Sequence, residues 1–130
     1  MTKEQQMVLE FHRAFNCKIS KYPQPYDPKT SQLRKTLIEE ELAELTEASE
    51  REDIVGIADA LGDLLYIVYG AAVTAGIDLE PIFEEIHRSN MTKANPDGSV
   101  TYNKAGKVIK PASYSPADLE PIIANQLLQG

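Results

Sequence analysis

Two groups of carboxylates lie inside segments that otherwise have the composition of buried helices. The first runs from Glu40 to Glu44 and the second from Asp59 to Asp63. Burying negative charge without a partner is costly, so something positive should meet these side chains. Hard divalent cations prefer oxygen ligands and can also bind an anionic, phosphorylated substrate. The spacing therefore predicts a site for a hard divalent cation between the two groups.

The first group needs a helix that turns its acids inward. No Gly or Pro interrupts residues 30–50, and Thr30 or Ser31 could cap a helix there. At helical spacing Glu41 and Glu44 fall within the apolar arc, and Glu40 lies at its edge. Metal ligation and a buried salt bridge to an Arg or Lys elsewhere both remain open for the two inward acids.

The second group lies on a segment, residues 53–75, that is apolar nearly all round, as a central helix would be. Asp59 and Asp63 are four residues apart and share one face. A short connection at residues 51–53 would make this helix antiparallel to the one before it, bringing the two acidic groups opposite each other. The alternative is that both aspartates reach solvent at the edge of a bundle.

The remaining segments complete an all-α fold, a four-helix bundle followed by a short β-hairpin and a terminal helix. We expect residues 1–95 to form the helical bundle, and 96–130 to form a C-terminal appendage of the same domain. The other expected elements are helices at 3–16 and 78–94, a proline-containing loop at 18–29, strands at 100–102 and 107–109, and a helix at 116–128.

Two further features have an ordinary and a functional interpretation. His12 is interpreted as a half-exposed residue of the first helix, because no second His lies nearby in sequence. Lys104, Lys107 and Lys110 make the appendage locally basic. They could close over an anionic ligand, or simply be solvated lysines of an edge hairpin.

Composition excludes several classes of protein. The 130 residues carry a net charge of −7 and no basic stripe, which disfavours nucleic-acid binding. Cys17 is the single cysteine, so no intrachain disulfide can form. The N-terminus is too polar for a signal peptide, and the longest apolar stretch, residues 64–75, is too short to cross a bilayer. We expect a cytoplasmic protein without a membrane partner.

The acidic groups, followed by Asn90 and Lys93, resemble the all-α nucleoside triphosphate pyrophosphohydrolase superfamily, which includes MazG-like enzymes, dimeric dUTPases and phosphoribosyl-ATP pyrophosphohydrolase. The resemblance spans about residues 33–94. It is closest to single-domain MazG-like members. The family's second motif is usually Glu-x-x-Asp, and Ala60 occupies the place of that Glu.

The resemblance implies hydrolysis of a nucleoside triphosphate, such as a dNTP, to the monophosphate and pyrophosphate, in a nucleotide-pool or house-cleaning role. The reaction would depend on Mg²⁺, or alternatively Mn²⁺. By this resemblance, Asn90 and Lys93 would contact phosphate or metal. We further expect Glu41, Glu44, Asp63 and Asp59 to bind metal, Glu40 to orient or deprotonate water, Lys107 to contact the substrate, and Phe15 and Asn16 to contact the base.

Two alternatives remain beside this hypothesis. Ala60 favours a non-catalytic helical module of the same fold that binds a nucleotide or a protein. The second alternative is a phosphoribosyl-ATP pyrophosphohydrolase of histidine synthesis, which the basic appendage disfavours. In every case the excess apolar surface of the helices predicts a homodimer or a dimer of dimers.

Overall fold

Five α-helices make up the regular structure of the chain, and there is no β-strand. The computed structural model describes residues 1–130. The all-α class expected from the sequence is confirmed. The helices are α1 (Lys3–Ala14), α2 (Pro28–Glu50), α3 (Ile54–Ala75), α4 (Leu79–Met91) and α5 (Glu120–Gln129).

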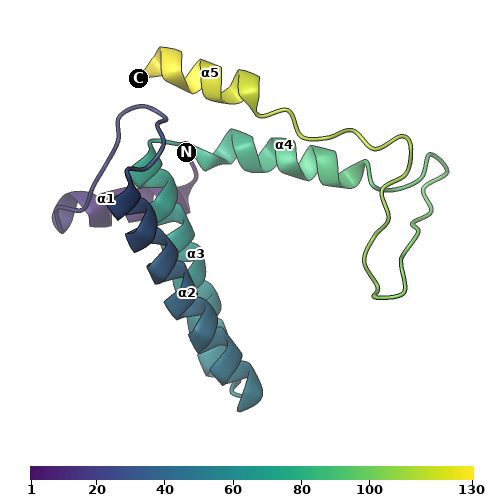
Figure 1. Ribbon diagram of the computed structural model, residues 1–130, viewed down its shortest axis with the longest axis horizontal. Coiled ribbons are helices and arrows are strands. Elements are labelled where there is room, and N and C mark those ends of the chain that lie inside the picture. The colour runs from purple at the N-terminus through teal and green to yellow at the C-terminus, as the bar shows by residue number, and fades with distance from the viewer. The chain divides into compact units, whose positions relative to one another are not determined.

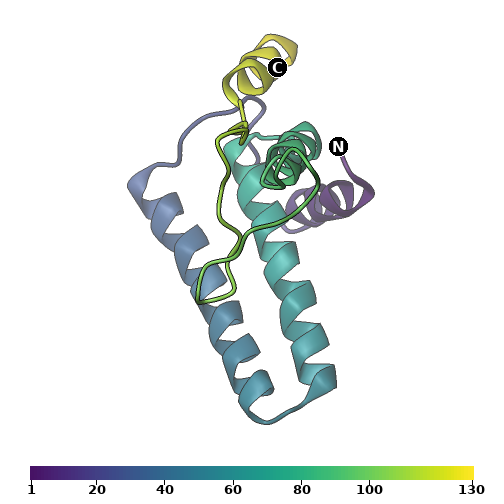
Figure 2. The same cartoon turned by 90° about the vertical axis from the view of Figure 1, so that its right-hand side faces the viewer.

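The longest helices, α2 and α3, lie side by side as an antiparallel hairpin (Figures 1 and 2). Only Arg51, Glu52 and Asp53 connect them, as the short connection in the sequence predicts. Asp53 caps α3 by accepting a hydrogen bond from the Gly56 N–H at 3.0 Å. Gly76, with φ of 74°, ends α3 in the left-handed conformation that glycine adopts readily.

The start of α2 differs from the expected cap at Thr30 or Ser31. The helix begins at Pro28, and Asp27 accepts a hydrogen bond from the Thr30 N–H at 2.8 Å. An aspartate followed by proline is a stronger start signal, because proline at the first helical position has no N–H to leave unpaired. Lys18 pairs with the same carboxylate at 3.0 Å and so ties the preceding loop to the cap.

Helix α1 lies across α3 rather than along the hairpin (Figure 2). Val8 is buried in this contact with 2% of its surface exposed, and the Phe11 ring meets the Tyr66 ring edge-on at 5.7 Å between centroids. The Gln5 side chain is also buried, donating to Ile77 O at 2.7 Å and accepting from the Leu79 N–H at 3.0 Å. These contacts fix α1 to the C-terminal end of α3.

The chain divides into two compact units. The first contains residues 1–79 and 126–130, and the second contains residues 80–125. The division at residue 95 expected from the sequence stays a prediction, as does the packing of the expected fourth helix in a bundle.

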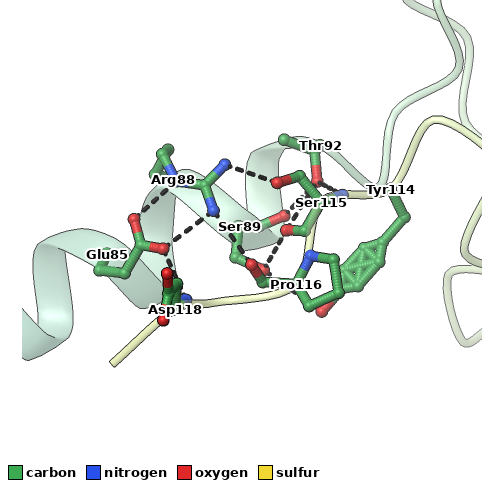
Figure 3. Close-up of polar contacts among 8 residues, drawn as sticks. All are labelled: Glu85, Arg88, Ser89, Thr92, Tyr114, Ser115, Pro116 and Asp118. Carbon is green, nitrogen blue, oxygen red and sulfur yellow. Dashed lines mark hydrogen bonds and ion pairs between the residues drawn. The ribbon is translucent and has the colours of Figure 1, made fainter. Parts of the chain in front are cut away.

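Within the second unit, the segment before α5 is fastened to α4 (Figure 3). Ser89 has only 2% of its surface exposed and donates to Ser115 O at 2.8 Å. The Thr92 hydroxyl accepts from the Ser115 N–H at 2.8 Å. Ser115 is therefore held in an extended tether and does not cap a helix. This explains why α5 begins at Glu120 and not at Pro116, where the sequence predicted its start.

A carboxylate reinforces the same tether. Glu85 accepts from Arg88 Nε at 2.6 Å and from the Asp118 N–H at 2.8 Å (Figure 3). These bonds lower the pKa of Glu85 to about 2, the hydrogen bond from Arg88 being the largest cause. The pair thus joins one turn of α4 to the residues just before α5.

The predicted β-hairpin does not form. Tyr102 and Val108 make one isolated antiparallel bridge, flanked by bonds from the Asn103 N–H to Lys107 O and from the Ile109 N–H to Thr101 O, each 2.8 Å. Most side chains of this segment are exposed, so no third strand or apolar face supports the pair. A two-stranded hairpin without such support is marginal in water.

Candidate active site

The register of the α2–α3 hairpin places Glu41 opposite Asp63. A side chain added at Gly70 would meet Arg34, and one added at Gly56 would meet Ala48, so these residues mark two facing levels. Glu41 lies midway between Arg34 and Ala48, and Asp63 lies midway between Gly56 and Gly70. By the same counting, Glu44 lies opposite Ala60.

Among these acids, Glu41 is the one with a raised pKa and a buried, unpaired oxygen. Its Oε2 atom is buried without a hydrogen-bond partner, although the side chain as a whole is only half-buried. Burial raises the pKa of Glu41 above its ordinary value, and the negative charges of Asp63, Glu44, Asp59 and Glu40 raise it further. The salt bridge considered as an alternative would have given this oxygen a partner, and none is present.

Ala60 fills the place where a second-motif Glu would stand. It is 1% exposed, whereas Asp59 and Asp63 are exposed on either side of it. Glu44, on the opposite helix, is also exposed. Asp59 is close enough to raise the pKa of Glu41. It precedes Ala60 by one residue, however, so the two side chains leave the helix in different directions. Ala60 thus places an apolar side chain among these acids, where the family's motif would place a further carboxylate.

Glu40 is exposed at the margin of this acidic seam, which we define as Glu40, Glu41, Glu44, Asp59 and Asp63. All five belong to the α2–α3 hairpin, and the pKa of Glu41 responds to the charge of the other four. In their present rotamers, no three carboxylate, imidazole or thiol groups are close enough to share a metal ion. The ligand assignments from the sequence therefore stay predictions.

Phe15 and Asn16 lie at the end of α1. The Phe15 ring stacks on Phe11 with 4.4 Å between centroids, yet 68% of the residue is exposed. Asn16 follows with a positive φ of 56°, which re-aims the chain into the proline-containing loop. Asn90, Lys93 and Lys107 belong to the second unit, and their contact with phosphate stays a prediction.

A cavity that the sequence did not reveal opens between α1, α2 and α3. Its volume is about 400 Å³, and His12, Arg34 and Tyr66 are among the residues that line it. His12 is 4% exposed, so its interpretation as half-exposed was wrong. The signal was available in the spacing, because Arg34 precedes Glu41 by two helical turns and so shares its inward face.

Three comparisons connect this arrangement to known proteins. The sequence matches the family model of phosphoribosyl-ATP pyrophosphohydrolase over residues 8–90, a range that includes the acidic seam and the cavity. It is 36% identical over 105 residues to an uncharacterized protein of Acanthamoeba polyphaga mimivirus. That match covers 75% of this chain and 41% of the viral protein, so the chain spans about two fifths of that relative's length.

A solved structure is similar along nearly the whole chain. It is a crystal structure of a protein proposed to be an NTP pyrophosphohydrolase, from Exiguobacterium sp. 255-15. The identity is 26% and the TM-score 0.50, and the match covers 98% of this chain and 95% of the other. This neighbour and the family model agree on an all-α, pyrophosphohydrolase-like protein.

Proposed function

Because the chain belongs to the phosphoribosyl-ATP pyrophosphohydrolase family, we propose that it hydrolyses a nucleoside triphosphate to the monophosphate and pyrophosphate. Water adds across the bond between the α-phosphorus and the oxygen bridging to the β-phosphate. The observation that carries the proposal is the Glu41 carboxylate, which faces Asp63 with one buried oxygen that has no partner. A hydrolase of polyphosphates needs a place to gather cations against its substrate's charge.

The residues of the acidic seam fit a hard divalent cation. Every donor is a carboxylate oxygen, the ligand type that Mg²⁺ and Mn²⁺ prefer. The buried Oε2 of Glu41 would gain a partner from a bound cation, whose positive charge would offset the neighbouring charges that raise the pKa of Glu41. Glu41, Glu44 and Asp63 would hold the ion, with Asp59 as a fourth ligand. When bound, such an ion neutralises phosphate charge and lowers the pKa of bound water.

The other assigned residues would position the substrate. Glu40, exposed at the margin of the acidic seam, would orient the attacking water and take its proton. Asn90 and Lys93, with Lys107, would contact the phosphates. Phe15 and Asn16 would contact the nucleoside.

We further infer a MazG-like substrate range, in which dNTPs are preferred to the phosphoribosyl-ATP that gives the family its description. A pyrophosphate-release screen tests both, using canonical and damaged dNTPs and phosphoribosyl-ATP with Mg²⁺ or Mn²⁺. We expect pyrophosphate from at least one dNTP, and its loss in Glu44→Ala. Release of orthophosphate would contradict cleavage between the α- and β-phosphates.

We propose that the protein is a homodimer, or a dimer of dimers, in the cytoplasm, and the exposed apolar surface of α3 supports the self-association. By length and composition the helix could cross a membrane, with 22 residues and a mean hydropathy of 1.5, so the expectation that no apolar stretch is long enough was wrong. Only 11% of its apolar stretch is buried within one chain. Asp59 and Asp63 lie within it, however, and carboxylates are costly in a bilayer. A second copy of the chain would cover the apolar face at less cost. Analytical ultracentrifugation that detects only monomer at micromolar concentration would refute the dimer.

Ala60 supports a second candidate, a non-catalytic module that binds a nucleotide or a protein. Its side chain is buried where another ligand carboxylate would complete the acidic seam. Nucleotide binding by calorimetry with no turnover across the whole screen would favour this candidate over the enzyme.

A further inference from the structure

The cavity between α1, α2 and α3 contains a buried cation without a carboxylate partner. Arg34 is 9% exposed, and its one hydrogen bond within the chain runs from Nη1 to the Thr74 hydroxyl at 3.3 Å. Its Nε is buried without a partner. Burial lowers the pKa of Arg34, and the groups that oppose this are the phenol of Tyr26 and the thiol of Cys17. A guanidinium held in this way is costly unless a ligand accepts its free N–H groups.

A hydrogen-bond acceptor lies beside these donors. His12 Nδ1 is 3.0 Å from Lys18 O, and a carbonyl can only accept, so Nδ1 carries the hydrogen. In the tautomer with its single hydrogen on Nδ1, the ring presents Nε2 as an acceptor. An added Cβ on Gly70 would lie 3.1 Å from Arg34 Nη2 and 3.2 Å from His12 Nε2. The donor and the acceptor thus both pack against Gly70, which brings them next to each other in the wall of the cavity.

One carbonyl oxygen holds this pair in place. Lys18 O accepts from His12 Nδ1 and also from the Thr74 hydroxyl at 3.1 Å. The same hydroxyl accepts from Arg34. The orientation of both side chains is therefore set before any ligand arrives, as a specificity site requires.

A donor next to an acceptor complements a carbonyl next to an N–H. Guanine, hypoxanthine, uracil and thymine carry this lactam edge, whereas adenine and cytosine present an amino group beside an unprotonated ring nitrogen. The rings of Phe11 and Tyr66 line the same cavity and offer faces on which a base can stack. The cavity volume of about 400 Å³ is at the lower end of the range for small-molecule sites.

The position along α2 suits a nucleotide that reaches from one site to the other. Arg34 is two turns from Glu41 on the same face, a separation of about 10 Å along the axis. This is close to the reach of a nucleotide from its α-phosphate to the edge of its base. We propose that Arg34 and His12 bind the lactam edge of a nucleobase and select oxo bases over amino bases. This inference rests on the proposed nucleotide substrate and adds its base class.

The first test needs no variant. Calorimetry with Mg²⁺ compares dIMP with dAMP, which differ only at the purine edge in question, and dUMP with dCMP, their pyrimidine equivalents. We expect dIMP and dUMP to bind about tenfold more tightly than dAMP and dCMP, since an amino base would leave the buried Arg34 donor and His12 acceptor without partners. Equal affinities, or tighter binding of dAMP and dCMP, would overturn the inference.

The second test locates the preference on the protein. Arg34→Met should remove the preference for dIMP, and Arg34→Lys should weaken it because an ammonium has no planar fork. Lys35→Met is the matched control, since Lys35 is an exposed cation on the same helix, and it should leave the preference unchanged. A preference that persists in Arg34→Met would overturn the assignment. If that variant does not fold by circular dichroism, the wild-type comparison decides.

Binding of monophosphates separates this inference from the proposed function. A protein that discriminates dIMP from dAMP but releases no pyrophosphate contradicts only the hydrolase. A protein that releases pyrophosphate from every dNTP alike, with equal monophosphate affinities, contradicts only the role of Arg34 and His12.

Discussion

Glu41 has a charge that the fold opposes in the absence of a cation. One of its carboxylate oxygens is buried without a partner, and four other acids add repulsion. A carboxyl group with a raised pKa lowers the stability of the fold wherever it is ionised, and this cost falls as the pH drops through the raised pKa. The ionised Glu41 carboxylate therefore lowers the stability of the metal-free fold, and the same negative charge would allow it to bind a cation.

Replacing Glu41 should change both the Tm of the metal-free protein and its response to Mg²⁺. We expect Glu41→Gln to have an equal or higher Tm than the wild type without metal, because the repelling charge is gone. The rise in Tm that Mg²⁺ gives the wild type should be absent in the variant. Thermal unfolding with and without Mg²⁺ measures both. Glu47→Gln, at an exposed position on the same helix, is the control and should keep the full Mg²⁺ response.

Ala60→Glu tests the missing carboxylate directly. The position is 1% exposed, so the larger, charged side chain should destabilise the metal-free protein by about 1–3 kcal/mol through overpacking alone. With Mg²⁺ the new carboxylate should gain a partner, and the Tm should rise by more than it does in the wild type. Ala58→Glu, on the exposed side of α3, should show neither effect. A metal response no larger than that of the wild type would contradict the facing of residues 44 and 60.

Periodicity could assign Glu41 to an inward face, because that needs only the local geometry of one helix. It also places Arg34 on that face, but the cavity that Arg34 shares with His12 depends on α1 crossing α3 beside Gly70, which periodicity cannot show. Both residues were visible in the sequence as types that are usually exposed. Contacts between distant segments decided their place.

At the scale of single helices, the start of α2 can be tested by comparing the observed cap, Asp27, with Ser31, one of the two caps expected from the sequence. Asp27→Ala should lower the Tm by about 4 °C, since it removes the hydrogen bond to the Thr30 N–H. Ser31→Ala should change it little, because Ser31 is exposed and lies within the first turn. Comparable losses in the two variants would contradict the cap at Asp27.

The tether of Glu85 should give the second unit a dependence on pH. The pKa of Glu85 is about 2 in the folded chain, below its ordinary value of 4.5. A depressed pKa contributes stability that is present above 4.5 and is lost as the pH falls from there towards 2. NMR titration of the Ser115 and Asp118 amides should report this release. Glu85→Gln should abolish it, while Glu84→Gln, at an exposed neighbour, should not.

The helices were more predictable than their ends. The apolar composition of residues 54–75 and the glycine at 76 identified α3 and its end, because both signals are local. The expected strands at 100–102 and 107–109 had suitable residues but no supporting surface, which a local pattern cannot reveal. Likewise, Ser115 has the type of a cap but is held by Ser89 and Thr92 of α4.

At the scale of the whole molecule, we expect the protein to self-associate, because α3 has a large exposed apolar surface. Leu65 is 51% exposed, and we expect Leu65→Lys to weaken the dimer at least tenfold by placing a charge in the interface. Sedimentation equilibrium of wild type and variant measures the change. Val100→Lys places the same charge on a 42% exposed residue outside α3 and should not alter the dimer. An unchanged mass distribution in Leu65→Lys would place the contact elsewhere.

The three-residue connection between α2 and α3 also has a consequence for how the chain folds. Contacts between segments adjacent in sequence cost little loop-closure entropy and form early, whereas α1 must find the far end of α3 across the intervening hairpin. The acidic seam should therefore assemble in the folding nucleus, before the cavity closes. Because the carboxylates of this early hairpin repel one another, divalent cations should speed up folding as well as bind to the folded protein.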